Sequence, residues 1–466
     1  MLWLGALLRR EQKGHVMQRI TLRAVAVSVA LALSGFAQAV DLTAVYQAAR
    51  GYDATFAAAE AAQRAGQEKA TQGRALWLPQ VTANGNYEHQ NETLGASAST
   101  AAAAGGASSI SASGQTYGYQ VTATQPIYNV AASTGNAQLH EQARVADVNF
   151  NAAKQSLIVR VAQAYFDVLY AQDSLEFVRA QKEAVGQQLA QAKKSFEVGV
   201  ATITDTNEAQ ASYDANVASE IAAQNALEVK QNAFTQLTGV PGDNLAPLAT
   251  RISATLPSPD NLDYWLKRAE DHSQEIDAQR GALAIAEAEI DKYRALRQPS
   301  VNLIGQTGET WNTGALGRLN GASQQQSLVG VQLTIPLYTG GTTSSKLRET
   351  LALRDQAQQQ LLATQRSVAQ NTKAAFLGVK SGAAQIKALE QALVSAQTSL
   401  DSTSLGREVG VRTTLDVLNT QQTLYSTKRD LAQARYNYLV SKLQLAQAVG
   451  ELSDKDLDDV NGQLKH

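Results

Sequence analysis

The chain of 466 residues contains no cysteine, and its two methionines, Met1 and Met17, both stand near the N-terminus. The absence of cysteine excludes disulfide bonds and also a lipid anchor on the first residue of a processed chain. Long hydrophobic runs are missing too, because no stretch of 18 apolar residues follows the N-terminal region, so no membrane-spanning helix is predicted. Any part of the chain that enters a membrane would therefore do so as β-strands.

Proline is scarce, and its placement is informative. Proline removes a backbone donor and clashes with the preceding helical turn, so it interrupts helices. More than a hundred residues pass without proline between Pro126 and Pro241 and again after Pro336, in tracts rich in Ala, Gln and Leu. Such tracts are typical of long helices. The eight prolines all stand at predicted boundaries: Pro79, Pro126, Pro241, Pro247, Pro257, Pro259, Pro299 and Pro336.

Signals of catalysis are also missing. The sequence has neither a P-loop nor a G-x-S-x-G elbow. The histidines lie far apart and show no metal-ligand spacing: His15, His89, His140, His272 and His466. We therefore expect no enzyme activity, no cofactor and no metal.

The first 39 residues have the composition of a secretory signal peptide. Arg19 and Arg23 precede an apolar run over 24–33, and Ala37-Gln38-Ala39 is a small-x-small cleavage site. Met17 would begin a leader of more usual length than Met1. Removal of this basic leader moves the formal charge from −2 to about −6. A mildly acidic exported chain argues against a nucleic-acid partner.

The sequence repeats itself once over a long distance. FEVGVATITD, which starts at Phe196, returns as REVGVRTTLD, which starts at Arg407, and TQPIY, which ends at Tyr128, returns as TIPLY, which ends at Tyr338. An offset of about 210 residues is far too long for a solenoid unit. We therefore predict two copies of one assembly. The predicted units are a first repeat over 40–240, a linker over 241–260, a second repeat over 261–450 and a C-terminal tail over 451–466.

Each repeat is predicted to hold a short helix, two strands, a very long helix and a second short helix. Apolar residues at three- and four-residue spacing support the long helices. At 1.5 Å per residue such a helix spans roughly 100 Å, so two short helices stacked end to end match one long helix. The predicted elements are 43–76, 80–90, 115–127, 131–197 and 204–239, and then 261–297, 300–311, 326–337, 343–406 and 414–450.

The predicted strands alternate between an apolar and a polar face. From Val81 to Tyr87 every second residue is apolar or glycine, and the residues between them are Thr and Asn. The strand from Val301 is less regular, because Ile304 falls on the polar face. Segments of about ten residues with one apolar face are typical of a membrane β-barrel with a wet lumen. A soluble antiparallel sheet with one solvated face would give the same pattern.

Other features favour the barrel. The predicted leader exports the chain, and the connecting loops over 91–114 and 312–325 are rich in small and polar residues, as outward-facing loops are. Aromatic residues gather near the strand ends: Trp77, Tyr87, Tyr117 and Trp311. Four strands cannot close a barrel around a channel, and open edges are forbidden in lipid. We therefore expect the sheet to close with copies from other chains, and we expect the Ala- and Gln-rich helices to need lateral neighbours as well.

From Asp41 to about Val460 the chain resembles the TolC family of outer-membrane exit ducts. The motifs that carry the resemblance include DLTAVYQAAR at Asp41, AYFDVLYAQDSL at Ala164, ITDTNEAQASYDA at Ile203, PSVNLIGQTG at Pro299, IPLYTGG at Ile335 and LDVLNTQQTLYSTKRDLAQARYNYL at Leu415. The resemblance implies an α+β membrane protein: a homotrimer with four strands per chain in one 12-stranded transmembrane β-barrel. A long periplasmic α-helical barrel would continue from the strands, with a belt at mid-height formed by the linker and the tail.

The resemblance also implies a function. A duct of this family stands in the outer-membrane lipid of a Gram-negative bacterium and extends into the periplasm. It accepts cargo from an inner-membrane RND pump or ABC exporter through a periplasmic adaptor protein, in drug efflux, in type I secretion, or in both. Two other classes stay open: a trimeric coiled-coil adhesin, which predicts one heptad seam and no duplicated strand pairs, and a periplasmic adaptor, whose usual biotinyl-like domain is missing here.

The duplicated motif stands where each long helix meets the following short helix. Glycine ends a helix readily, and a Thr/Asp cluster caps the next one, so a pair of plain hairpin turns would explain the motif. The resemblance makes these turns the periplasmic tips of the duct. It implies that small apolar notches receive the adaptor: Val198, Gly199 and Val200 in the first repeat, and Val409, Gly410 and Val411 in the second.

The resemblance further implies a gate at the tips, closed by polar links between the two hairpins. Arg412 stands where the gate arginine is expected, opposite Thr204 and Asp205. The sequence departs from the family at two positions, because Arg407 replaces a gate tyrosine and Lys194 stands where a glutamine commonly contributes. Two cations near one aspartate would either strengthen the closed state or crowd it with unpaired charge.

An entrance ring of carboxylates is implied as well. Asp416 matches a family carboxylate that appears three times around the pore of a trimer, whereas Asn419 replaces the acid of the second ring. We therefore predict a weaker preference for cations, and weaker blockade by multivalent cations, than a duct with both rings would show.

Overall fold

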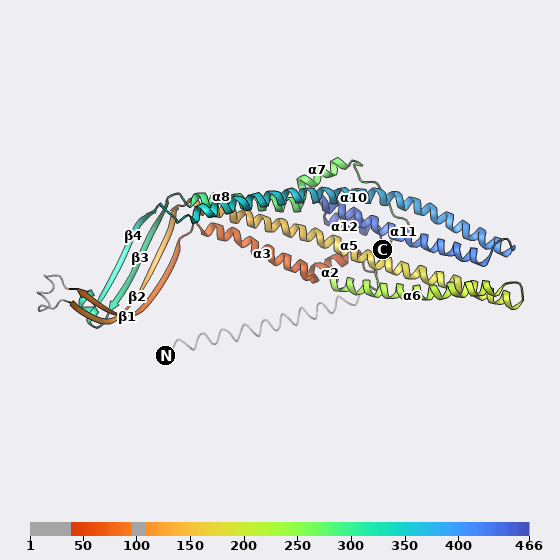
Figure 1. Ribbon diagram of the computed structural model, residues 1–466, viewed down its shortest axis with the longest axis horizontal. Helices are drawn as coiled ribbons and strands as arrows, with labels where there is room; N and C mark the ends of the chain where they lie inside the picture. The colour runs from red at the N-terminus through yellow and green to blue at the C-terminus, as the bar shows by residue number, and fades with distance from the viewer. Residues whose placement is uncertain (1–38, 96–108, 466) are drawn as a thin grey trace.

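The computed structural model describes residues 39–95 and 109–465 (Figure 1). Of the leader expected over 1–39 only the last residue is described, and the loop expected over 91–114 is described in part. The molecule is elongated, with a sheet at one end and a long helical body beyond it (Figure 1). Within the described residues, no helix has both the length and the apolar character needed to cross a membrane.

Two sets of elements follow the predicted order. The first set is α2 (Leu42–Tyr52), α3 (Ala54–Ala75), β1 (Gln80–Gly95), β2 (Ser109–Tyr128), α5 (Val130–Glu197) and α6 (Ile203–Thr238). The second is α7 (Leu262–His272), α8 (Gln274–Ala295), β3 (Ser300–Asn312), α9 (Ala315–Asn320), β4 (Ser323–Thr334), α10 (Thr342–Glu408) and α11 (Thr414–Ala448). The tail holds α12 (Asp454–Asn461).

The short helices stack end to end along the long ones, as predicted. Helix α5 packs against α3 near the sheet and against α6 farther away, and α10 packs in the same way against α8 and then α11 (Figure 1). Helices α8 and α11 also contact α5 and so lie between the two long helices. The helical body is therefore a layer of four columns, two of which are continuous and two of which are jointed.

The prediction of one unbroken helix over 43–76, and of another over 261–297, is wrong. Asp53 has an extended backbone (φ −65°, ψ 113°) and separates α2 from α3, while its carboxylate accepts hydrogen bonds from the amides of Thr55 and Phe56. Ser273 breaks the second helix with nearly the same angles (φ −60°, ψ 126°). Each break turns the chain at mid-length. There α2 packs against α5 and α6, and α7 packs against α10.

The four strands form one antiparallel sheet in the order β1-β2-β3-β4. Strands β1 and β2 extend farther from the helices than predicted, into the segment expected to be loop. Strand β4 lies three residues earlier than predicted and stops before Pro336, which has no amide to donate. Helix α9 was not predicted, and its buried Leu316 lies against the sheet near Gly114.

Strand pairing places residues of the same predicted face next to one another in β1, β2 and β3. Val121 pairs with Ala83 on one side and Thr307 on the other, whereas its neighbour Thr122 pairs with Thr82 and Gln306. On the apolar face, Tyr117 and Trp311 stack with ring centroids 5.6 Å apart near the outer end of the strands. The apolar side chains of β4 on this same face are exposed in a single chain: Val329, Val331 and Leu333. The sheet thus has one face that a single chain leaves uncovered.

The largest hydrophobic core lies at mid-length, where the linker and the tail wrap the columns. Tyr165 of α5 is fully buried, and its hydroxyl lies 3.0 Å from the carbonyl oxygen of Val40 and 2.9 Å from that of Ala246. Leu248 of the linker forms a bridge with Leu464 of the tail. The start of the described chain, the linker and the tail are thereby joined into one collar around α5.

Candidate gate at the helical tips

The two turns that carry the duplicated motif lie at the end of the helical body farthest from the sheet (Figure 1). The first joins α5 to α6, and the second joins α10 to α11. Each column pair therefore ends in a helical hairpin, and the chemistry of the two turns decides what this end of the molecule can do.

The first turn is fixed by backbone geometry. Gly199 has φ +75°, which lets the chain leave α5, and the amide of Val200 donates to the carbonyl oxygen of Ser195 at 2.9 Å. Thr202 then begins α6 with a capping box: the Asp205 amide donates to the Thr202 hydroxyl oxygen, and Asp205 Oδ2 accepts from the Thr202 amide.

The second turn repeats this arrangement. Gly410 has φ +79°, and the amide of Val411 donates to the carbonyl oxygen of Gly406 at 2.8 Å. Thr413 begins α11 with the same capping box, closed by Asp416. The prediction that glycine ends each long helix and that a Thr/Asp pair caps the next one is confirmed.

The valines of both turns are exposed to solvent. Between 67 and 77% of the surface of each side chain is accessible: Val198, Val200, Val409 and Val411. Nothing lies within 4 Å of the position that a Cβ would take on Gly199 or Gly410. Each turn thus presents two apolar knobs beside an open glycine. Their role as adaptor contacts stays a prediction.

The capping carboxylates are held in the ionised form. Hydrogen bonds from the Thr202 hydroxyl and amide lower the pKa of Asp205 below its ordinary value. Hydrogen bonds from the Thr413 amide and hydroxyl do the same to the pKa of Asp416, and the positive charge of Arg412 adds to the effect. Both tips therefore carry a negative charge that persists into mildly acidic solution.

The structure does not join the residues of the predicted gate within one chain. Among the described residues, no hydrogen bond or ion pair links Arg412 to Asp205 or Thr204. Arg412 is exposed and packs across Gly406 of its own hairpin, and Lys194 and Thr204 are exposed as well. Asn419 is exposed on α11, one turn beyond the capping box. The gate and ring roles of these residues stay predictions.

One link between the hairpins does exist. The guanidinium of Arg407, near the end of α10, donates a hydrogen bond to the side-chain oxygen of Gln188 on α5. Below it, Leu418 of α11 is buried against Val185 and Leu189 of α5 in a small hydrophobic cluster. Sequence reasoning singled out Arg407 but missed Gln188 and Leu418. The sequence carries no signal for Gln188, since glutamine is frequent throughout these helices.

In the part of the chain that the structure describes, no group of three or more His, Asp or Glu side chains is placed to hold a metal ion. The site is a pair of capped turns with exposed valines, two ionised aspartates and long cationic side chains. Such a surface is suited to contact with other proteins and with ions.

Comparison with known proteins agrees with this architecture. The profile of the family described as "Outer membrane efflux protein" matches residues 45–240 and 265–451. Outer membrane protein TolC of Vibrio cholerae is 35% identical over 442 residues, which cover 94% of this chain and 97% of that protein. The alkaline protease secretion protein AprF of Pseudomonas aeruginosa is 32% identical over 336 residues, covering 72% and 69%.

A solved structure shows the same fold at low sequence identity. The outer membrane protein VceC of Vibrio cholerae superposes with a TM-score of 0.74 at 18% identity, covering 88% of this chain and 96% of that one. The two matched ranges take in both sets of strands and both helical hairpins, tips included. The chain belongs to the outer membrane efflux protein family.

Proposed function

We propose that the chain is one subunit of a trimeric outer-membrane exit duct, which conducts small molecules or proteins out of the cell and catalyses no reaction. The observation that carries this proposal is a four-stranded sheet with two open edges and an uncovered apolar face, mounted on a helical body about as long as a 67-residue helix. At 1.5 Å per residue such a helix is roughly 100 Å long.

The open edges of the sheet support the trimer. Strands β1 and β4 stand at the two ends of the strand order, so each has one side without a partner in a single chain. In lipid, unpaired backbone groups cost several kcal/mol each, and closure removes them. Three copies joined β4 to β1 give a 12-stranded barrel, whose lumen would be lined by the Thr, Asn and Gln face.

The exposed tips support an entrance at the other end. A duct needs a source of cargo and energy, and the four exposed valines offer apolar contacts to the hairpins of a periplasmic adaptor. An inner-membrane RND pump or ABC exporter would deliver the cargo to the adaptor. The family description names efflux, and the name of AprF indicates protein secretion, so both uses are within the proposal.

The gate is proposed to close between hairpins of the assembled trimer. Arg412 is exposed and free of ion pairs within the described chain, so it can reach Asp205 and Thr204 on a hairpin of a neighbouring copy. Lys194 lies in the last turn of α5, before the turn that leads to Asp205. It would add a second positive charge next to the one supplied by Arg412. Arg407 already ties its hairpin to α5 through Gln188. Exposed links of this kind are worth about 0.2–1 kcal/mol each, so an adaptor could release them.

Single-channel recording in planar bilayers tests the gate. Arg412→Ala and Asp205→Asn should each raise the open probability of the isolated trimer several-fold, because each removes one side of the proposed link; asparagine can still accept the capping hydrogen bonds at 205. Lys380→Ala is the matched control, since it removes an exposed cation from a surface ion pair with Asp260, on α10 away from the tip. Unchanged closure in both tip variants would refute the gate assignment.

The adhesin alternative disagrees with the structure. It predicts one heptad seam and no duplicated strand pairs, whereas the described chain has two strand pairs in one sheet and two separate helical hairpins. Heat-stable trimers that need detergent for extraction from outer-membrane fractions would support the duct. A stable water-soluble monomer recovered without detergent would contradict it.

A further inference from the structure

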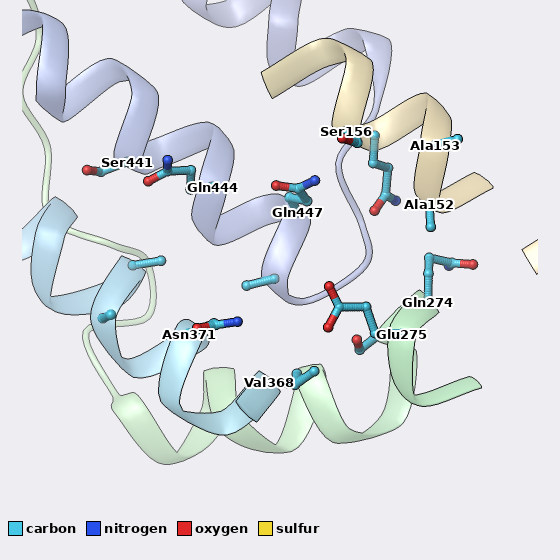
Figure 2. Close-up of a pocket in the computed structure, with 15 residues that line it drawn as sticks. Ala152, Ala153, Ser156, Gln274, Glu275, Val368, Asn371, Ser441, Gln444 and Gln447 are labelled. Carbon is cyan, nitrogen blue, oxygen red and sulfur yellow. The ribbon is translucent and has the colours of Figure 1, made fainter. Parts of the chain in front are cut away.

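A cavity of about 700 Å³ lies at mid-length, at the joint where α8 begins and α11 ends. Gln274, the first residue of α8, and Ala448, the last residue of α11, both line it (Figure 2). The long helices α5 and α10 form the other walls. Its volume is within the range of pockets that bind small molecules.

All but one of the amide and hydroxyl side chains on the cavity wall lack a partner in the described part of the chain; the exception is Gln155, whose amide donates to the carbonyl oxygen of Gly450 at 2.8 Å. Among the described residues, no hydrogen bond is made by the other seven: Ser156, Ser273, Gln274, Asn371, Ser441, Gln444 and Gln447. Ser273 is 4% exposed and stands at the N-cap of α8, yet its hydroxyl makes no capping bond. The cavity is open enough for water or a bound molecule to serve as the partner of these groups.

The charge of the wall is of one sign. Glu275 is the only ionisable side chain that lines the cavity, and it makes no ion pair or hydrogen bond in the described part of the chain. Its carboxylate points into the cavity on the side of Asn371 and Gln447 (Figure 2). A free carboxylate attracts a cation and repels an anion.

The wall also has an apolar part. Small side chains of α5, α10 and α11 complete the lining: Ala152, Ala153, Ala374, Ala375 and Ala448, together with Val368. A metal ion would need several oxygen ligands at fixed distances, and one carboxylate in a cavity of this size does not supply them. An organic cation, in contrast, would use both the carboxylate and the alanine surface.

We propose that this cavity binds an organic ammonium ion with an apolar stem. Its ammonium group pairs with Glu275 and donates hydrogen bonds to the side-chain oxygens of Asn371 and Gln447, while its stem lies along the alanines. The site lies away from the tips and from the sheet. The proposal therefore goes beyond conduction and does not depend on the gate.

Fluorescence titration of the purified trimer in lipid nanodiscs tests the proposal, with dansylcadaverine as the probe. This probe carries one protonated amine on an alkyl stem, and its neutral analogue dansylpentylamide lacks the charge. We expect saturable binding of dansylcadaverine that Glu275→Gln weakens at least tenfold. We expect the neutral analogue to bind the wild-type trimer no better than dansylcadaverine binds the Glu275→Gln variant.

The matched control is Glu287→Gln, which removes an exposed, unpaired carboxylate from the same helix, about 18 Å farther along it. This variant should bind dansylcadaverine as the wild type does. Asn371→Leu supplies a second variant if Glu275→Gln fails to assemble, and it should weaken binding several-fold while keeping the number and branching of the side-chain heavy atoms. Equal affinity of the wild type and the cavity variants, or equal binding of the cation and its neutral analogue, would overturn the proposal and leave a water-filled joint.

Discussion

At the scale of single residues, Asp53 shows how one side chain ends one helix and begins another. Its carboxylate caps α3 and accepts a hydrogen bond from Arg160 of α5 at 2.6 Å. Burial alone would raise the pKa of Asp53, but the hydrogen bond and charge of Arg160 and the two capping amides outweigh it and lower the pKa. Ionisation of this carboxyl therefore stabilises the fold.

Substitution of Asp53 separates the cap from the charge. Asp53→Ala should destabilise the fold by about 0.5–2 kcal/mol, because the first amides of α3 lose their acceptor, whereas Asp53→Asn keeps the acceptor and should cost less. Arg160 is more than a third exposed, so the ion pair adds little to this loss. Thermal unfolding followed by circular dichroism should rank the midpoints as wild type, then Asn, then Ala.

The pH dependence of the same pair has a definite sign. A lowered pKa in the folded state stabilises the fold above the ordinary carboxyl pKa, and this contribution is lost as the pH falls through the lowered value. The difference in midpoint between wild type and Asp53→Asn should therefore be constant from pH 7 to pH 5 and shrink below about pH 4. A difference that grows on acidification would contradict the assignment.

Asp416 is the residue expected to set the charge of the entrance. Its lowered pKa keeps it ionised throughout the neutral range, so three copies would give a fixed ring of negative charge. Asp416→Asn should keep the capping acceptor and reduce the preference for cations, measured as a smaller reversal potential in a KCl gradient. Asp214→Asn, on α6 of the other hairpin, is the control for the loss of one negative charge. An unchanged reversal potential in Asp416→Asn would place the selective field elsewhere in the duct.

At the scale of elements, the tip turns depend on glycine. Gly410 has φ +79°, and nothing would touch an added Cβ, so Gly410→Ala tests the backbone alone. Alanine in this conformation costs about 1 kcal/mol. We expect the amides of Val411 and Arg412 to exchange with solvent roughly fivefold faster in hydrogen-exchange mass spectrometry.

Gly51→Ala is the matched control for this experiment. Gly51 lies in α2, an added Cβ would again touch nothing within 4 Å, and alanine favours a helix over glycine. Exchange at the tips should be unchanged in this variant. Equal exchange at the tips of wild type and Gly410→Ala would show that the turn does not need a left-handed residue.

The elements also show which features the sequence makes predictable. The long helices are predicted to within two residues of Val130–Glu197 and Thr342–Glu408, because proline-free tracts and duplicated Gly and Thr/Asp signals mark their limits. The breaks at Asp53 and Ser273 are not predicted, since neither residue interrupts a helix by its own geometry. The contact of Arg407 with Gln188 joins residues 219 positions apart, and only the packing of the two hairpins creates it.

At the scale of the whole molecule, the two faces of the sheet would meet different surroundings in the proposed barrel, one facing lipid and the other facing water. Val121 and Thr122 are neighbours on β2, and the pairing places them on opposite faces, Val121 beside Ala83 and Thr122 beside Gln306. An arginine on the lipid face near the middle of the bilayer costs about 2–4 kcal/mol in each subunit, whereas an arginine in a wet lumen does not meet lipid. Val121→Arg should therefore lower the yield of heat-stable trimer in the outer membrane, measured by gel electrophoresis of unboiled samples.

Thr122→Arg, its matched control, should assemble normally and shift ion selectivity towards anions. Loss of trimer in Thr122→Arg with normal assembly of Val121→Arg would mean that the sheet faces the membrane with its polar side, and the proposed duct would be wrong.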